Sequence, residues 1–131
     1  MSQWTHVAAI FRVDSFRFAG KKLNFTEIFG EELGYDDLDA WYEADTCPEK
    51  FLPFGSEGSL HMSVWENPKQ NHLAAYTVSV FGDLRNYSNI EKIMSWFDEK
   101  CKLVHIRQAV ITVDNEYVVD TKTYVDEEEV P

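Results

Sequence analysis

The sequence predicts an α+β fold, with a ferredoxin-like split βαβ pattern and an extra C-terminal strand. Two segments carry apolar residues at helical spacing, and others alternate apolar and polar residues as strands do. Their order is strand, helix, two strands, helix, strand and a further strand. This order predicts an antiparallel-rich sheet with two helices on one face. The length of 131 residues suits a single domain over 1–125, followed by an acidic tail over 126–131.

The first strand is predicted over 4–18, where β-branched and aromatic residues are frequent. Its residues alternate between two faces, which are Val7, Ala9, Phe11 and Val13 on one side and His6, Ala8, Ile10 and Arg12 on the other. Because both faces contain apolar residues, we expect each to be partly covered. Gly20 and the two lysines after it predict a turn.

The first helix is predicted over 25–33, where four apolar residues share a helical face: Phe25, Ile28, Phe29 and Leu33. Asn24 or Thr26 can cap its start, and Gly34 can end it. Residues 35–59 show no sustained period, so we expect a long ordered loop with at most one helical turn around 38–43. A loop of this length in a compact domain is either functional or wrongly assigned.

A hairpin is predicted from strands over 60–66 and 72–81, joined by a turn over 67–71. The Gly82-Asp83 step predicts that the chain leaves the second strand there. The second helix is predicted over 89–104, with Ser88 and Glu91 as a capping box. A strand over 105–114, a turn at 114–116 and a last strand over 117–125 complete the pattern.

Composition excludes a membrane span, because no run of about 18 apolar residues is present. The first residues lack the basic start and long apolar stretch of a secretory signal. Cys47 and Cys101 are too few for a disulfide scaffold, so both thiols are expected to be reduced. We therefore expect a protein of the cytoplasm, and of the host cytoplasm if a phage encodes it, with no membrane partner.

Charge is the unusual feature of the composition. The chain has 23 acidic and 12 basic side chains, a net charge of −11. The imbalance is concentrated between Glu27 and Glu57, where ten residues are acidic and only Lys50 is basic. Such a chain should not bind DNA or RNA directly, because their phosphates attract cations. It should be attracted to a host protein with a basic surface.

The sequence contains no motif for a metal or a cofactor. Its four histidines are scattered, neither cysteine belongs to a CxxC pair, and no GxSxG elbow is present. One glycine-rich segment, Gly55-Ser56-Glu57-Gly58-Ser59, leaves two interpretations open. It is either a tight turn that leads into the strand at Leu60, or part of a pocket for a phosphate-bearing nucleotide. That pocket would use Gly55, Ser56, Gly58, Ser59 and Arg85.

Three stretches carry a resemblance: WTHVAAIFRVD near the start, the Gly55–Ser59 segment and YTVSVFGDLR over 76–85. They are similar to a group of small hypothetical proteins of bacteriophages and prophages, over most of the chain. No catalytic residue can be carried over from that group. The resemblance implies only a context, in which small acidic phage proteins often bind and block host machinery, including defence nucleases.

These observations predict a non-enzymatic acidic binding protein. It would be a phage accessory or anti-defence factor that docks on a basic nucleic-acid-binding surface of a host protein, for example to inhibit CRISPR. The predicted partner-binding residues are Glu31, Glu32, Asp36, Asp37, Asp39, Trp41, Tyr42, Glu43 and Asp45. Three alternatives stay open: an acidic face that only confers solubility, a nucleotide sponge or sensor at Gly55–Ser59, and a metal-assisted nuclease. An exposed sheet edge would also permit a homodimer.

Overall fold

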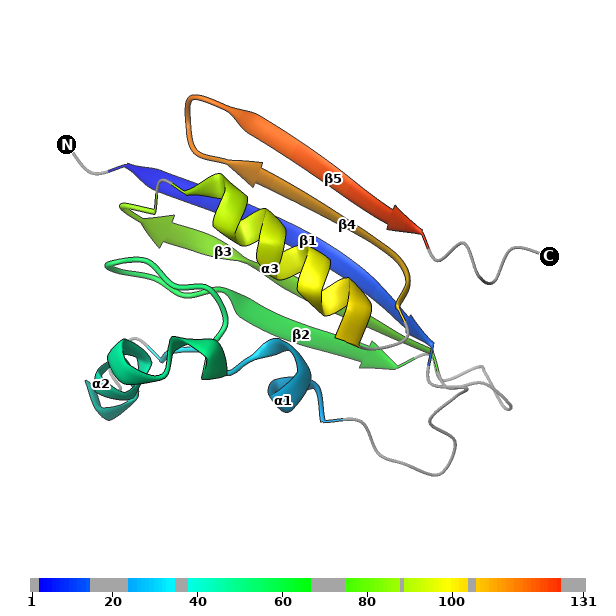
Figure 1. The fold of residues 1–131 in the computed structure, drawn as a ribbon, viewed down its shortest axis with the longest axis horizontal. Coiled ribbons are helices and arrows are strands. Elements are labelled where there is room, and N and C mark those ends of the chain that lie inside the picture. Colours follow the sequence, from blue (N-terminus) through cyan, green and yellow to red (C-terminus); the bar gives the residue numbers. More distant parts are fainter. Residues whose placement is uncertain are drawn as a thin grey trace.

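A single sheet with one long helix across its face forms the body of the protein in this computed structural model (Figure 1). The structure describes residues 3–14, 24–34, 38–66, 75–87, 89–103 and 106–125. The strands are β1 (Trp4–Asp14), β2 (His61–Glu66), β3 (Ala75–Arg85), β4 (Ile106–Asp114) and β5 (Val119–Val125). The helices are α1 (Phe25–Phe29), α2 (Leu38–Thr46), the short 3-10 helix η2 (Pro48–Lys50) and α3 (Ile90–Leu103).

The five strands follow the order β2-β3-β1-β4-β5, and every neighbouring pair is antiparallel. The predicted α+β class with an antiparallel sheet is therefore confirmed. The split βαβ detail stays a prediction, because α1, α2 and η2 stand between β1 and β2 where that pattern has one crossover helix. The predicted acidic tail over 126–131 and the predicted turns at Gly20 and over 67–71 lie outside the described residues.

The central strand β1 shows why the alternation in its sequence matters. Val7, Ala9, Phe11 and Val13 are buried, whereas the residues between them are exposed, with Ile10 at 49%. The expectation that both faces are partly covered was therefore wrong for this strand. One face of β1 is core and the other lies open, because α3 and α1 pack on a single side of the sheet.

The core forms where α3 meets the sheet. Ile93, Phe97 and Cys101 are buried at the predicted helical spacing. The Phe11 ring of β1 lies 4.9 Å from Phe29 of α1 and 5.3 Å from Phe97 of α3, measured between ring centroids. Burial of these side chains supplies the main driving force for this arrangement.

The start of α3 differs from the predicted capping box. The helix begins at Ile90, and the Asn89 side-chain oxygen accepts a hydrogen bond from the backbone N–H of Lys92 at 3.2 Å. Asn89 is thus the N-cap residue, and the Lys92 N–H also donates to the Asn89 backbone carbonyl at 3.2 Å. Ser88, on which the predicted box depends, lies outside the described residues, as does Val104 at the predicted helix end.

The segment from 25 to 59 is more helical than predicted in one part and less in another. The first helix ends at Phe29, not at 33, because the chain turns at Gly30 and passes against the backbone of Phe51 and Leu52. Leu33 then packs in a second small cluster with Ala44 and Phe51. The predicted long loop contains α2 with nine residues, followed by η2.

The predicted strand exit at Gly82-Asp83 was also wrong. Gly82 lies inside β3, where it pairs with Val7 of β1, and the strand continues to Arg85. A Cβ at Gly82 would lie 2.9 Å from the carbonyl oxygen of Ser59. The glycine therefore allows another segment to approach the strand closely.

Among the described residues, no helix is both long and apolar enough to cross a membrane.

Candidate functional site

The glycine-rich turn from Gly55 to Ser59 is fastened to the end of β3 by backbone hydrogen bonds. The Ser56 N–H donates to the Arg85 carbonyl at 3.0 Å, and the Arg85 N–H donates to the Glu57 carbonyl at 3.0 Å. Gly58 has a φ of +81°, and a Cβ there would lie 2.2 Å from the carbonyl oxygen of Asp83. Because neither Gly55 nor Gly58 has a side chain, the turn can approach β3 more closely than other residues would allow.

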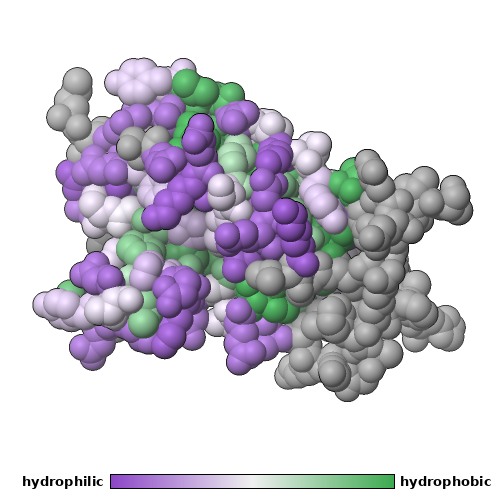
Figure 2. All heavy atoms as spheres, viewed as in Figure 1, coloured by the Kyte–Doolittle hydropathy of each residue, from purple (hydrophilic) through white to green (hydrophobic). Residues whose placement is uncertain are grey.

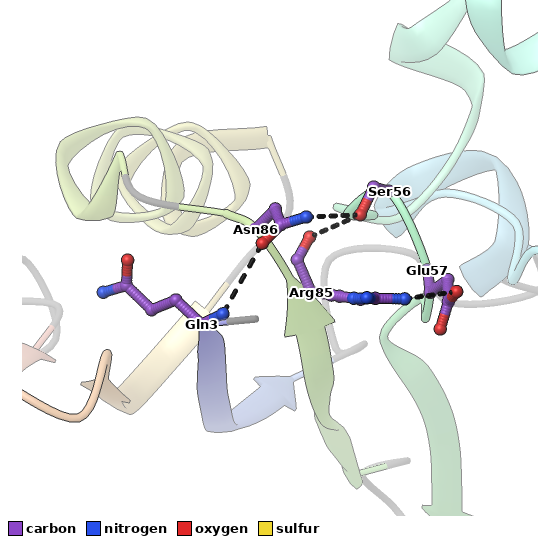
Figure 3. A network of polar contacts seen from close by, with 5 residues as sticks. All are labelled: Gln3, Ser56, Glu57, Arg85 and Asn86. Carbon is purple, nitrogen blue, oxygen red and sulfur yellow. Dashed lines mark hydrogen bonds and ion pairs between the residues drawn. The ribbon is translucent and has the colours of Figure 1, made fainter. Parts of the chain in front are cut away.

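The side chains of this turn form hydrogen bonds with Arg85 and Asn86 at the end of β3 (Figure 3). Arg85 Nη1 donates to Glu57 Oε1 at 2.6 Å, and the Ser56 hydroxyl donates to the Arg85 carbonyl at 3.2 Å. The Asn86 amide donates to Ser56 Oγ at 3.3 Å. Because Arg85 already has a carboxylate partner, these contacts favour the tight turn over the phosphate-binding interpretation.

A pocket of about 550 Å³ is lined in part by two residues of the same turn, Gly58 and Ser59. Its lining consists of Trp4, Glu32, Leu33, Trp41, Gly58, Ser59, His61, Phe81, Gly82 and Asp83. Glu32 and Trp41 come from the predicted acidic docking segment, and Gly58 and Ser59 from the predicted nucleotide turn. The structure therefore brings members of both predicted sites to one cavity.

Three aromatic side chains contribute to the lining of the pocket. The Trp41 indole is fixed, since its Nε1–H donates to the Gly34 carbonyl at 3.0 Å and its ring meets Phe54 edge-on at 5.8 Å. Phe81 of β3 is 48% exposed, and Trp4 begins β1 beside the turn. Such rings offer apolar faces on which a flat ligand can stack.

The buried Ser59 hydroxyl forms its hydrogen bonds with backbone groups of the protein. It accepts a hydrogen bond from the Leu33 N–H at 3.2 Å and donates to the Leu60 carbonyl at 3.1 Å. These bonds tie the Glu32–Leu33 segment to the turn. Ser59 is therefore a positioning residue that joins two segments of the lining.

Two histidine–carboxylate pairs stand at the pocket. His61 of β2 pairs with Glu32, and both line the cavity. His6 Nδ1 of β1 lies 2.5 Å from Oδ1 of Asp83, its neighbour across the β1–β3 ladder. The hydrogen bond to Asp83 raises the pKa of His6, against a smaller opposing effect of desolvation. A histidine oriented by a carboxylate is a common arrangement for a general acid or base.

With histidine counted as neutral, the formal charge of the lining is negative. Glu32 and Asp83 supply two carboxylates, and no lysine or arginine stands among the described residues of the lining. The Glu32 and Asp83 side chains are 42% and 62% exposed, so solvent screens them in part. This pocket therefore favours uncharged or cationic ligands over phosphates.

The remaining residues of the predicted docking surface lie elsewhere. Asp39, Tyr42, Glu43 and Asp45 are exposed on α2, and Glu43 Oε1 lies 3.3 Å from Lys50 Nζ. Glu31 is exposed beside the pocket, and its backbone bridges to Phe51. Asp36 and Asp37 lie outside the described residues.

Sequence reasoning missed five of the side chains that form the pocket and its pairs: Trp4, His6, His61, Phe81 and Asp83. All lie on the open face of the sheet, where polar and aromatic residues alternate with core residues. That alternation is a readable signal for an exposed face. The register that brings these residues together is not readable, because it pairs strands far apart in the chain.

Among the described residues, no group of three or more His, Cys, Asp or Glu side chains is placed to hold a metal ion.

Comparison with known proteins gives one structural likeness. No family model matches the sequence, and no curated protein matches it. The chain is similar to the solved structure of a phage SAM lyase in complex with S-methyl-5′-thioadenosine. The likeness covers 93% of this chain and 91% of that chain, with a TM-score of 0.47 and 10% sequence identity.

This comparison corrects two predictions. The chain was expected to be a non-enzymatic anti-defence factor docking on a basic host surface, but the similar structure is that of an enzyme with a small molecule bound. The docking function and the expectation that the chain is not an enzyme were therefore wrong. The similar protein comes from a phage, while the resemblance to small hypothetical phage proteins stays a prediction. At this level of similarity no ligand or residue role can be transferred to this chain.

Proposed function

We propose that this protein binds a small, uncharged or cationic compound with a flat ring, of the nucleoside class, in the pocket beside the Gly58–Ser59 turn. One observation carries the proposal. The pocket combines aromatic side chains with two carboxylates, and its described lining has neither lysine nor arginine. Such compounds are cytoplasmic metabolites, which suits the location expected from the sequence.

The dimensions and rigidity of the pocket support a small ligand. Its volume of about 550 Å³ lies in the range of small-molecule sites, roughly 300–1,000 Å³. Trp41 is held within the protein by its hydrogen bond to Gly34 and its contact with Phe54. A preformed aromatic wall lowers the entropic cost of binding a flat ring.

The polar groups of the pocket select the ligand's charge. The carboxylates of Glu32 and Asp83 can accept hydrogen bonds from sugar hydroxyls or amines, and aromatic faces attract cations. A phosphate would have to approach both carboxylates, and the described lining offers it neither lysine nor arginine. The proposal therefore departs from a phosphate-bearing nucleotide and favours a nucleoside or its cationic derivative.

A second proposed role is acid–base chemistry on the bound compound. His61 lines the pocket and is paired with Glu32, so it can exchange a proton with a ligand there. His6 does not line the pocket and acts on it through Asp83, as a positioning residue. These two pairs are what favours an enzyme over a simple binding protein.

Calorimetric titration with two compounds tests the proposal. S-methyl-5′-thioadenosine is uncharged and SAM carries a sulfonium cation, so together they cover the charges that the pocket favours. We expect saturable binding of at least one, weakened about tenfold or more by Trp41→Leu and clearly weakened by Glu32→Gln. The matched control Glu31→Gln removes the same charge from the neighbouring exposed residue and should leave the affinity unchanged.

Binding of neither compound, nor of adenosine, would contradict the proposal, as would equal effects of Glu32→Gln and Glu31→Gln. The catalytic role is tested separately, by following the loss of SAM chromatographically during incubation with the protein. Turnover that His61→Gln abolishes, while ligand affinity persists, is the expected result for an enzyme. Binding without turnover of any bound compound would leave the binding function and reject the acid–base role.

A further inference from the structure

A second cavity lies between α3 and the segment that contains η2, and it shares no residue with the pocket described above. Its volume is about 430 Å³. In Figure 2, hydrophobic surface is visible between the hydrophilic surfaces over α3 and over the α2–η2 segment. The lining of this cleft consists of Pro48, Glu49, Phe51, Leu52, Pro53, Phe54, Tyr87, Lys92, Trp96, Glu99 and Lys100.

The walls of the cleft are apolar. Phe51 and Leu52 are buried, and Phe54 is only partly exposed. Pro48 and Pro53 add rigid apolar surface on the same side. An apolar ligand body would displace water from the accessible side chains, Pro48, Pro53 and Phe54, with a gain in free energy.

Trp96, which contributes to the lining of the cleft, has an unsatisfied hydrogen-bond donor. The Nε1–H of Trp96 is buried and has no hydrogen-bond partner within the part of the chain that the structure describes. Leaving such a donor unpaired costs roughly 1–3 kcal/mol. Trp96 is set edge-on against Phe11 of the core at 5.9 Å, so packing fixes the position of its indole.

Two more polar groups of the cleft are donors. Lys100 is partly buried, its pKa is lowered by that burial, and it makes no ion pair with any described residue. Burial raises the pKa of Tyr87, so its hydroxyl stays protonated at neutral pH and can donate. A partly buried ammonium with no ion-pair partner among the described residues, beside a neutral hydroxyl donor, is suited to an anionic acceptor.

The charges of the cleft indicate how many negative charges the ligand carries. Glu49 and Glu99 balance Lys92 and Lys100, so the lining is formally neutral in a chain of net charge −11. A singly charged carboxylate can pair with Lys100 at little repulsion from the two glutamates. A dianionic phosphate would find no second partly buried ammonium in the described lining for its second charge, because Lys92 is exposed.

We propose that this cleft is a second binding site, for a small monocarboxylate with an apolar body. The carboxylate lies towards Lys100 and the Tyr87 hydroxyl, and the apolar body lies against Pro53 and Phe54. The site is independent of the nucleoside-class pocket, since the two share no lining residue.

Nuclear magnetic resonance of the indole N–H groups tests the site directly. The chain has four tryptophans, and the signal of Trp96 is identified by its loss in Trp96→Phe. The probes are the carboxylates 3-phenylpropionate and octanoate. The uncharged amide 3-phenylpropionamide is the control for 3-phenylpropionate. We expect a saturable shift of the Trp96 signal with at least one acid, and binding of the amide at least about fivefold weaker than that of 3-phenylpropionate.

Variants of α3 distinguish the site from a general effect of charge. Lys100→Gln should weaken carboxylate binding about tenfold, whereas Lys102→Gln, an equal charge change at an exposed position of the same helix, should not. If Lys100→Gln does not fold, Tyr87→Phe provides the second variant and should weaken binding severalfold. No saturable shift with either acid, equal affinity for acid and amide, or equal effects of the two lysine variants would overturn the proposal.

Discussion

Replacing Gly58 by alanine should damage the fold and the pocket together. Gly58 has a φ of +81°, which residues with a Cβ rarely adopt. The added Cβ would lie 2.2 Å from the carbonyl oxygen of Asp83, which is backbone and cannot rotate away, and 3.8 Å from the Trp4 ring. The turn would have to move off β3, and both Asp83 and Trp4 line the pocket.

The size of the effect follows from two separate costs. A residue with a Cβ in the left-handed region costs about 1–2 kcal/mol. Forcing an extra methyl group into a closely packed place typically costs about 1–3 kcal/mol more. We therefore expect Gly58→Ala to lower the free energy of unfolding by about 2–5 kcal/mol.

Gly55→Ala provides the comparison, since its Cβ would lie 2.4 Å from the Arg85 carbonyl oxygen but its φ is outside the left-handed region. It should show only the packing cost, about 1–3 kcal/mol. Urea unfolding followed by circular dichroism measures both variants. A loss below about 1 kcal/mol for Gly58→Ala, or a larger loss for Gly55→Ala, would refute the reasoning.

Three further predictions concern the core, the histidine and the thiols. Phe97 is fully buried, so Phe97→Ala should cost about 3–5 kcal/mol in urea unfolding, and a loss under about 1 kcal/mol would contradict its place in the core. The pKa of His6 is raised by Asp83, so the pair stabilises the folded protein below the ordinary pKa of 6.5, and this stability is lost as pH rises through the folded value. The difference in melting temperature between wild type and Asp83→Asn should accordingly be larger at pH 5.5 than at pH 8.5. An equal difference at the two pH values would contradict a stabilising His6–Asp83 pair. Burial raises the pKa of Cys101 to about 12, so iodoacetamide should label the partly exposed Cys47 first in the folded protein, as peptide mass spectrometry would show.

The parts of the fold that sequence predicted well are those determined by local periodicity. The stripe of Ile93, Phe97 and Cys101 identifies the core face of α3, because one helical face must be buried continuously. The alternation of Val7 and Phe11 identifies the core face of β1 in the same way. The local pattern did not indicate that the opposite face of β1 is exposed. Exposure of that face depends on the side of the sheet against which the helices pack.

The pocket could not be predicted in the same way, because it depends on contacts between distant segments. His6 meets Asp83 through the β1–β3 register, and His61 meets Glu32 through the path of the chain after α1. The role of Gly58 likewise depends on the strand that approaches it. Glycines can be read from the sequence as a turn, but the partner that makes them necessary cannot.

The ratio of the affinities for adenosine and adenosine 5′-monophosphate tests the central claim most directly. The two compounds share their ring and sugar and differ in the phosphate, which would meet Glu32 and Asp83 in the pocket. Calorimetry should find adenosine bound about tenfold or more tightly, a difference of at least about 1.4 kcal/mol, with the gap narrowing as salt screens the carboxylates. Tighter or equal binding of the monophosphate would contradict the account, as would binding of neither compound by a protein that also fails to bind S-methyl-5′-thioadenosine and SAM.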